Sequence, residues 1–293
     1  MGKAERNRAR NARERIAAQQ AAARRAERRR VILISGGSVV VVIAVVVALV
    51  LIAVNRAPAR QGSSGALPAS VAAEITTVPA STLAAVGTGA LPSAPAGLPI
   101  RSITDTPLTS GGKPEMLYIG AEFCPYCAAM RWAMAVALSR FGTFGPLTGI
   151  HSSSADVYPN TATLTFYKQR YTSPYLTFTP VENETVTHAP LQPVTSAQQA
   201  LWVKYDTTNG SQGYPFIDFG NKVIITGPLY DPGVLKGLSW AQIASQLKDP
   251  SGTVARNILG TANYITAAIC VMTRNAPASV CTAAPIPAIE RHL

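Results

Sequence analysis

Residues 31–54 form an uncharged, apolar run of 24 residues, VILISGGSVVVVIAVVVALVLIAV. A helix needs about 20 such residues to cross the hydrocarbon core of a bilayer. The apolar region of a cleaved signal peptide is shorter, about 7–15 residues, and a small-residue cleavage site follows it. The length of the run therefore predicts an uncleaved signal anchor that spans the membrane once.

The charge of the chain is concentrated before this run. Residues 1–30 contain 11 of the 26 Lys and Arg residues and three acids, whereas residues 61–293 contain 13 basic and 12 acidic residues. Because basic segments stay on the cytoplasmic side, we predict a cytoplasmic N-terminus in the cell membrane and an extracytoplasmic remainder, residues 55–293. We interpret the basic tail as a topology determinant that contacts membrane lipid. Nucleic-acid binding is the disfavoured alternative, because no aromatic side chain is interleaved with the arginines for stacking on bases.

Composition divides the chain into four segments. The basic cytoplasmic tail is residues 1–30 and the membrane anchor is residues 31–54. Residues 55–100 are rich in Ala, Pro, Gly, Ser and Thr, which is typical of a flexible spacer, and residues 101–293 form the extracytoplasmic domain. Scattered apolar positions at 70–86 leave open a short helix that packs on the domain. The anchor and the spacer explain a charged fraction of 14%, below the usual value of about 25%.

The outer domain has the pattern of an α/β protein. Apolar and aromatic runs predict strands, and apolar residues at helical spacing predict helices. Two helices are expected to open with capping boxes, at Thr195 with Gln198 and at Ser239 with Gln242. Gly142 is a candidate end for the helix that follows the first strand. The expected strands are 116–123, 147–154 and 162–167, with a hairpin at 214–227, and the expected helices are 128–142, 195–206, 239–248 and 251–273.

The sequence Cys124-Pro125-Tyr126-Cys127 lies between the first strand and its helix. At the start of a helix, free backbone N–H groups and the helix dipole favour a thiolate and lower the pKa of a cysteine. Pro125 suits the first helical turn, where its missing N–H costs nothing. A second cysteine three residues later lies one turn on and can resolve a mixed disulfide. Cys124 is therefore the candidate nucleophile, and Cys127 is the candidate resolving thiol.

A zinc site is disfavoured, because it needs two further ligands. The other two cysteines are spaced differently, and the three histidines are scattered at His151, His188 and His292. We expect neither a metal nor another cofactor. A structural disulfide between Cys124 and Cys127 without turnover remains open, since such a bond would persist outside the cytoplasm.

The strand–FCPYC–helix unit and the hairpin opened by Tyr214-Pro215 before a C-terminal helix resemble the thioredoxin-like superfamily over residues 113–250. In that superfamily a cis-proline begins the corresponding strand and faces the CxxC, which implies this role for Pro215. The long stretch between Cys127 and Pro215 implies a helical insertion around 192–206, as in DsbA-like oxidoreductases. The whole layout is also similar to a prokaryotic membrane-anchored family catalogued as domain of unknown function 929.

The chain departs from the superfamily at several positions. The Pro-Tyr dipeptide is that of glutaredoxins, but Tyr214 stands where glutaredoxins and thioredoxins usually have Val or Thr. The buried acid of thioredoxin is missing from the nearby strand positions Tyr118, Ile119 and Gly120. Glu122 is a candidate proton acceptor or modulator of the Cys124 pKa, and the alternative is an exposed loop acid. Tyr126 and Tyr214 are further candidate modulators, although we interpret Tyr126 mainly as a packing residue.

Cys270 and Cys281 flank the turn after the last helix. We predict a structural disulfide that fixes the C-terminal tail and contributes about 3 kcal/mol in the loop-entropy model. The alternative is a second redox pair that relays electrons to the CxxC.

These features lead to two hypotheses. The first is a membrane-anchored, extracytoplasmic thiol-disulfide oxidoreductase that acts on reduced or misoxidised envelope proteins. Its location favours oxidation, with a quinone-linked membrane thiol oxidase as candidate partner. The second is a non-catalytic, thioredoxin-like envelope binding or assembly subunit with structural disulfides.

Overall fold

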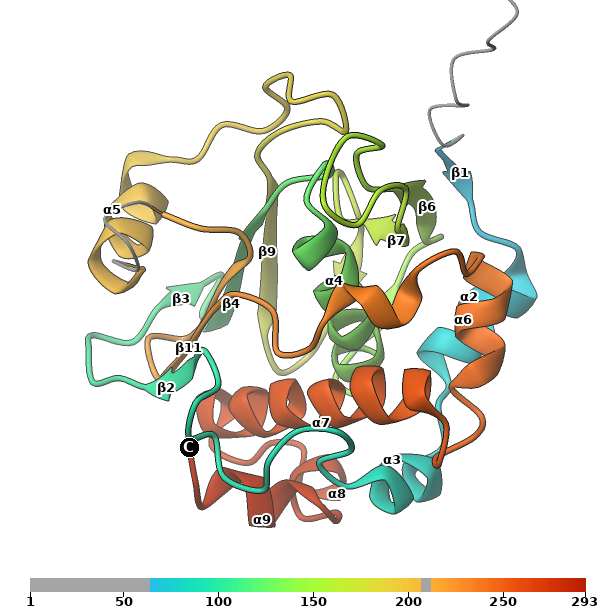
Figure 1. Cartoon of the computed structure of the whole chain (residues 1–293). Coiled ribbons are helices and arrows are strands. Elements are labelled where there is room, and N and C mark those ends of the chain that lie inside the picture. The colour runs from blue at the N-terminus through green and yellow to red at the C-terminus, as the bar shows by residue number, and fades with distance from the viewer. Residues whose placement is uncertain (1–63, 207–211) are drawn as a thin grey trace, which may run out of the picture. The chain divides into compact units, whose positions relative to one another are not determined.

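The computed structural model describes residues 64–206 and 212–293 (Figure 1). The predicted basic tail, membrane anchor and start of the spacer lie outside these residues. The described part is a mixed α/β domain around a mixed sheet with the strand order β2-β11-β10-β4-β3, in which β9 also pairs with β4. These strands are β2 (Ile100–Ser102), β3 (Thr109–Ser110), β4 (Lys113–Gly120), β9 (Thr177–Glu182), β10 (Phe216–Phe219) and β11 (Val223–Thr226).

The direction of the strands gives the sheet its mixed character. β9 runs parallel to β4, whereas β10 runs antiparallel to β4 and to β11. β4 is buried at five consecutive residues, Met116 to Gly120, because helices cover both faces of the sheet. Its side chains alternate between two clusters, with Met116 and Tyr118 in one and Leu117 and Ile119 in the other, as the period of a strand requires.

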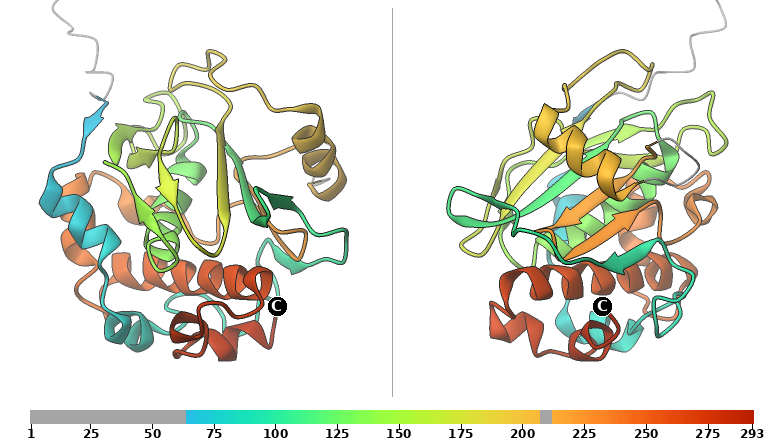
Figure 2. Two further views of the ribbon diagram at one scale, coloured as in Figure 1. Left: turned by 180° about the vertical axis from the view of Figure 1, so that it is seen from behind. Right: turned by 90° about the vertical axis from the view of Figure 1, so that its left-hand side faces the viewer.

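Three helices cover the sheet: α4 (Pro125–Leu138), α5 (Ser196–Tyr205) and α7 (Thr253–Thr273). Side chains of α4 and α7 share a core cluster with one face of the sheet, and Trp202 of α5 packs on the other face. Figures 1 and 2 show α5 on the opposite side of the sheet from α4 and α7. The remaining helices are α2 (Ala69–Thr76), α3 (Ala80–Val86), η2 (Pro232–Leu235), α6 (Trp240–Gln246), α8 (Ala278–Cys281) and α9 (Ile286–Glu290).

Two small sheets lie mainly in the chain between α4 and β9. β6 (Thr148–His151) pairs with β7 (Ala162–Thr165) and with the N-terminal β1 (Gly65–Ala66). β5 (Thr143–Phe144) pairs with β8 (Tyr171–Thr172). The β6–β7 hairpin packs beside α4, since Trp132 of α4 donates a hydrogen bond from Nε1 to the Ala162 carbonyl at 3.0 Å.

Most of the elements expected from the sequence are present, and both predicted capping boxes form. Several boundaries differ from the expected ones by a few residues. The expected end of α4 was wrong, because the helix ends at Leu138 with Ser139 as its C-cap and not at Gly142. The glycine is needed for a different reason, because a Cβ at Gly142 would lie 2.3 Å from the Thr172 carbonyl oxygen of β8.

Part of the stretch interpreted as spacer is folded. The segment 70–86 forms the two helices α2 and α3, and Val71, Ile75, Leu83 and Val86 belong to the core of the domain. Within the described residues no single helix has the length and apolar character needed to cross a bilayer, although α2 and α3, bent by 60°, reach that threshold as a pair. The predicted anchor at 31–54 is outside the described residues.

Candidate active site around a cysteine pair

Cys124 and Cys127 lie where the sequence placed them, between β4 and α4. Cys124 is the N-cap of α4, and its Sγ accepts a hydrogen bond from the Cys127 backbone N–H at 3.2 Å. Pro125 occupies the first turn. Both cysteines are free thiols; Cys124 is 4% exposed and Cys127 is fully buried. Across residues 64–206 and 212–293, no three His, Cys, Asp or Glu side chains are grouped so that they could hold a metal ion.

The two thiols have opposite pKa shifts. Burial alone raises the pKa of Cys124, but hydrogen bonds from the Cys127 thiol and backbone N–H, together with the charge of Arg131, bring it below its usual value. Burial and the neighbouring Cys124 raise the pKa of Cys127 well above its usual value. The pair therefore combines a thiolate that can act as a nucleophile with a partner that holds its proton.

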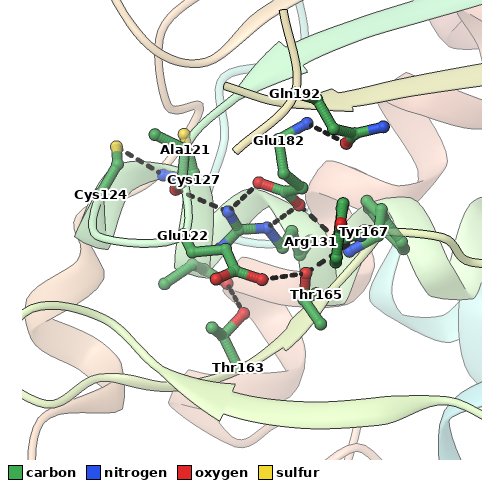
Figure 3. Close-up of polar contacts among 12 residues, drawn as sticks. Ala121, Glu122, Cys124, Cys127, Arg131, Thr163, Thr165, Tyr167, Glu182 and Gln192 are labelled. Atoms are coloured by element: carbon green, nitrogen blue, oxygen red, sulfur yellow. Dashed lines mark hydrogen bonds and ion pairs between the residues drawn. The ribbon is translucent and has the colours of Figure 1, made fainter. Parts of the chain in front are cut away.

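A buried ion pair lies behind the cysteines. Arg131 donates from Nε to Glu182 Oε1 at 2.8 Å and from Nη2 to Glu182 Oε2 at 2.6 Å, and both side chains have zero exposure. Arg131 Nη2 also donates to the Ala121 carbonyl at 2.6 Å. Figure 3 shows the guanidinium group below the loop that carries the two sulfur atoms. The arginine therefore joins α4, the end of β9 and the loop that leads to Cys124.

Neither Arg131 nor Glu182 was predicted from the sequence as part of the site, although the position of Arg131 in its helix is unusual. Arg131 is the one charged residue in the α4 sequence PYCAAMRWAMAVAL, one turn after Cys127. A charged residue in an apolar helix is almost never buried unless it is paired, so a partner was to be expected. Glu182 ends β9 in the sequence TFTPVE, and that pattern does not distinguish a buried partner from an exposed acid.

Glu122 is half-buried, with its carboxylate turned away from the sulfur atoms (Figure 3). The Thr165 hydroxyl donates to Glu122 Oε1 at 2.7 Å, and burial raises the pKa of Glu122. The side chain lines an open groove of about 700 Å³ together with Thr148, Lys168 and Thr187. Neither sequence interpretation describes this position fully, because the carboxylate is partly buried yet faces the groove.

Tyr214 packs against the cysteine cluster together with Phe123 and Tyr126. Its hydroxyl accepts a hydrogen bond from Asn183 Nδ2 at 2.6 Å, and burial raises the pKa of Tyr214 to about 12. Tyr214 is therefore neutral at physiological pH.

The peptide bond between Tyr214 and Pro215 is cis, and Pro215 is buried directly before β10. Tyr126 is half-buried and makes an edge-to-face contact with Tyr158 at 6.0 Å between ring centroids. This contact is consistent with the packing role expected for Tyr126.

Cys270 and Cys281 form a disulfide, as predicted. The bond links the end of α7 to α8, and both residues are buried. It joins the C-terminal helices to α7 and belongs to the large core cluster, whereas Cys124 and Cys127 form a separate small cluster.

A family model described as Domain of unknown function (DUF929) matches residues 100–271. The match covers more than half of the chain and includes the CxxC, Arg131, Glu182 and Pro215. No curated protein and no solved structure matches the chain.

Proposed function

This chain belongs to the DUF929 family, a family of unknown function, and we propose that it is a membrane-anchored, extracytoplasmic thiol-disulfide oxidoreductase acting on protein thiols. The observation that carries this proposal is the geometry of the CxxC: Cys124 is the N-cap of α4, its Sγ accepts the Cys127 backbone N–H, and Cys127 is fully buried. The opposite directions of the two pKa shifts agree with this geometry. A stabilised thiolate at the N-cap and a buried, protonated partner are the two groups that disulfide exchange needs.

We further infer a thioredoxin-like fold. Three features support it: the β4–CxxC–α4 unit, the cis Tyr214-Pro215 bond directly before the β10–β11 hairpin, and the long helix α7 that follows. α5 follows β9 and precedes β10 in the chain, and its Trp202 packs on one face of the sheet, so we assign it to the basic α/β layers. The additional structure is then the pair of hairpins between α4 and β9, instead of the helix at 192–206 that the resemblance implied.

Membrane attachment is part of the proposal and rests on the sequence. The uncharged run at 31–54 is long enough to span a bilayer, and the excess of basic residues before it favours a cytoplasmic N-terminus. The domain would then work outside the cytoplasm, where disulfides persist.

In the oxidising direction, a client thiolate attacks Cys124 Sγ of the Cys124–Cys127 disulfide. The bond between the two cysteines breaks, and Cys127 leaves and takes up a proton, in keeping with its raised pKa. A second client thiolate then attacks the client sulfur of the mixed disulfide, and Cys124 leaves as a thiolate. Two electrons pass from the client to the domain, and a quinone-linked membrane thiol oxidase is the proposed partner that removes them. A low pKa at Cys124 makes it a good leaving group, which favours this direction over reduction.

The proposal is tested with the full-length protein in detergent or nanodiscs. We expect Cys124 to be alkylated at a pH below the usual range for a thiol, and the protein to oxidise a reduced, unfolded substrate. Cys124→Ser should abolish this activity. In Cys127→Ala the Cys124 thiolate can still attack a client disulfide and release one client thiolate, and the resulting mixed disulfide should accumulate because no resolving thiol is present. The matched control, Cys270→Ala with Cys281→Ala, should still exchange disulfides.

The second hypothesis, a non-catalytic envelope binding or assembly subunit, predicts a different outcome. In that case Cys124→Ser would leave both the oxidation assay and the cellular phenotype unchanged, and the proposed function would be rejected.

A further inference from the structure

We propose that the buried ion pair between Arg131 and Glu182 sets the reduction potential of the Cys124–Cys127 pair, with Arg131 as a positioning residue that stabilises the reduced state. This inference rests on the proposed function, because it concerns the direction in which the same cysteine pair exchanges disulfides. It assigns a role to two residues that neither the CxxC nor the cis-proline requires.

The positions of the side chains hold the charge of Arg131 close to the cysteine loop. Arg131 lies one turn beyond Cys127 on α4, and its guanidinium group makes two bonds to Glu182 and one to the Ala121 carbonyl. Ala121 begins the loop that leads to Cys124, and it shares the small cluster of the two cysteines. Glu182 is held in turn by the Phe166 backbone N–H, which donates to Oε1 at 3.1 Å. The positive charge is therefore held in one place beneath the cysteine loop (Figure 3).

The buried ion pair contributes little to stability relative to an apolar alternative. Replacing a buried ion pair by apolar residues of similar volume is often neutral or stabilising, so stability alone does not account for this one. Arg131 Nη1 and the Tyr118 hydroxyl are also buried without a hydrogen-bond partner among the described residues, and each such group carries a cost of desolvation. All other residues of α4 are uncharged, so an apolar residue at position 131 would fit the helix. An electrostatic effect on the cysteines explains why a charged pair is buried at this position instead of apolar residues.

The sign of the effect follows from the charges near the pair. Arg131 is a permanent cation that lowers the pKa of both cysteines, and in a poorly solvated site its field is only weakly screened. Stabilising the thiolate stabilises the reduced dithiol relative to the disulfide, which makes the disulfide a stronger oxidant. Glu182 offsets part of the positive charge. Among the described residues, the titratable and charged groups around the site are Cys124 at the N-cap of α4, Tyr126, Cys127 and Arg131 of α4, Tyr118 of β4, Glu182 of β9, Glu122 of the loop, and Tyr214, Glu184 and His188 beside them.

Two variants of the full-length protein should shift the potential in opposite directions. Arg131→Met combined with Glu182→Leu removes both charges, and we expect the thiol–disulfide equilibrium with glutathione to move about tenfold toward the disulfide, or about 30 mV. Glu182→Gln leaves Arg131 without its counter-charge and should move the same equilibrium toward the dithiol. Acid quenching, alkylation and peptide mass spectrometry report Cys124–Cys127 separately from Cys270–Cys281. The pH dependence of Cys124 alkylation should shift upward in the double variant and downward in Glu182→Gln.

Arg140→Met is the matched control. It also removes one arginine, but from the turn after α4, where burial is the cause of its lowered pKa. We expect the equilibrium to stay within about twofold of the wild type, because the lost charge is not beside the cysteines.

Opposite shifts would support the inference, since a merely structural disturbance has no reason to change sign. Equal or absent shifts, in variants that still exchange disulfides, would overturn it and leave the proposed function standing. If the double variant fails to fold, the direction measured for Glu182→Gln decides alone. If the wild-type pair does not exchange disulfides with glutathione or with a client, the proposed function fails and the inference fails with it.

Discussion

We expect the buried side chain of Asp218 to make the stability of this domain dependent on pH. Its side chain lies in β10 with zero exposure. Oδ1 accepts a hydrogen bond from the Asn221 backbone N–H at 2.6 Å, and Oδ2 has no partner among the described residues. Burial, reinforced by Glu115 and Asp105 and opposed by the Asn221 bond, raises the pKa of Asp218 from 3.8 to about 7. The folded protein therefore holds this proton over a range in which the unfolded chain has lost it.

This difference in proton binding determines whether stability rises or falls with pH. Between pH 3.8 and about 7 the folded state binds more protons than the unfolded state, so the free energy of unfolding falls as the pH rises. The stability contributed by the protonated Asp218 is fully present below pH 3.8. It is lost once the pH rises above the pKa of Asp218 in the folded protein, about 7. At about 1.36 kcal/mol per pH unit, this interval corresponds to a total loss of roughly 4 kcal/mol. Between pH 5 and pH 8, roughly 2–3 kcal/mol of that loss should be observed.

Asp218→Asn tests this directly. The amide keeps an oxygen for the Asn221 N–H and carries no titratable proton. Urea unfolding of both proteins at pH 5 and pH 8 gives the difference in their free energies of unfolding, from which the other titrating groups cancel. The free energy of unfolding of the wild type should fall by roughly 2–3 kcal/mol more than that of the variant when the pH is raised from 5 to 8.

Asp249→Asn is the control, because Asp249 is an exposed acid whose pKa is lowered by Ser251. Its pH profile should follow that of the wild type. Parallel profiles for the wild type and Asp218→Asn would refute the reasoning, because they would mean that Asp218 ionises in the folded protein as readily as in the unfolded chain.

Three further predictions concern stability. Replacing both Cys270 and Cys281 by Ala should lower the free energy of unfolding by about 3 kcal/mol in urea titrations, with disulfide exchange at Cys124 retained; an unchanged midpoint would show that the bond does not constrain the chain. Thr195→Ala removes the capping box of α5 and should cost about 1 kcal/mol, whereas Thr195→Ser should restore most of it. Tyr118→Phe deletes a buried hydroxyl without a partner among the described residues and should leave the midpoint unchanged or raise it. A loss of more than about 1 kcal/mol would mean that this hydroxyl is hydrogen-bonded after all.

The features predicted correctly from the sequence are those that depend on residues close together in the chain. The capping boxes at Thr195 and Ser239 need a side chain and a backbone N–H three residues apart. The N-cap position of Cys124 follows from the strand before it and the apolar helix after it. The β10–β11 hairpin turns at Gly220 and Asn221, which both have positive φ, a conformation that Gly and Asn tolerate best.

The features that were missed depend on contacts between distant segments. Arg131 and Glu182 are 51 residues apart, and the residues around each of them do not identify the other as its partner. Gly142 was interpreted as a helix end, although its function is to admit the Thr172 carbonyl of β8. The apolar positions at 70–86 were visible, but their burial depends on the rest of the core, which composition does not describe.

Net charge is a poor guide to the chemistry of this domain. Residues 61–293 carry 13 basic and 12 acidic side chains, yet one arginine without solvent contact acts on the cysteine pair, because buried charges are screened far less than exposed ones. The same burial couples positions 131 and 182, since either charge alone would lack a partner. A relative with an apolar residue at position 131 should therefore also lack an acid at position 182, and its CxxC disulfide should be the weaker oxidant. A relative that keeps the acid opposite an apolar residue would contradict this coupling.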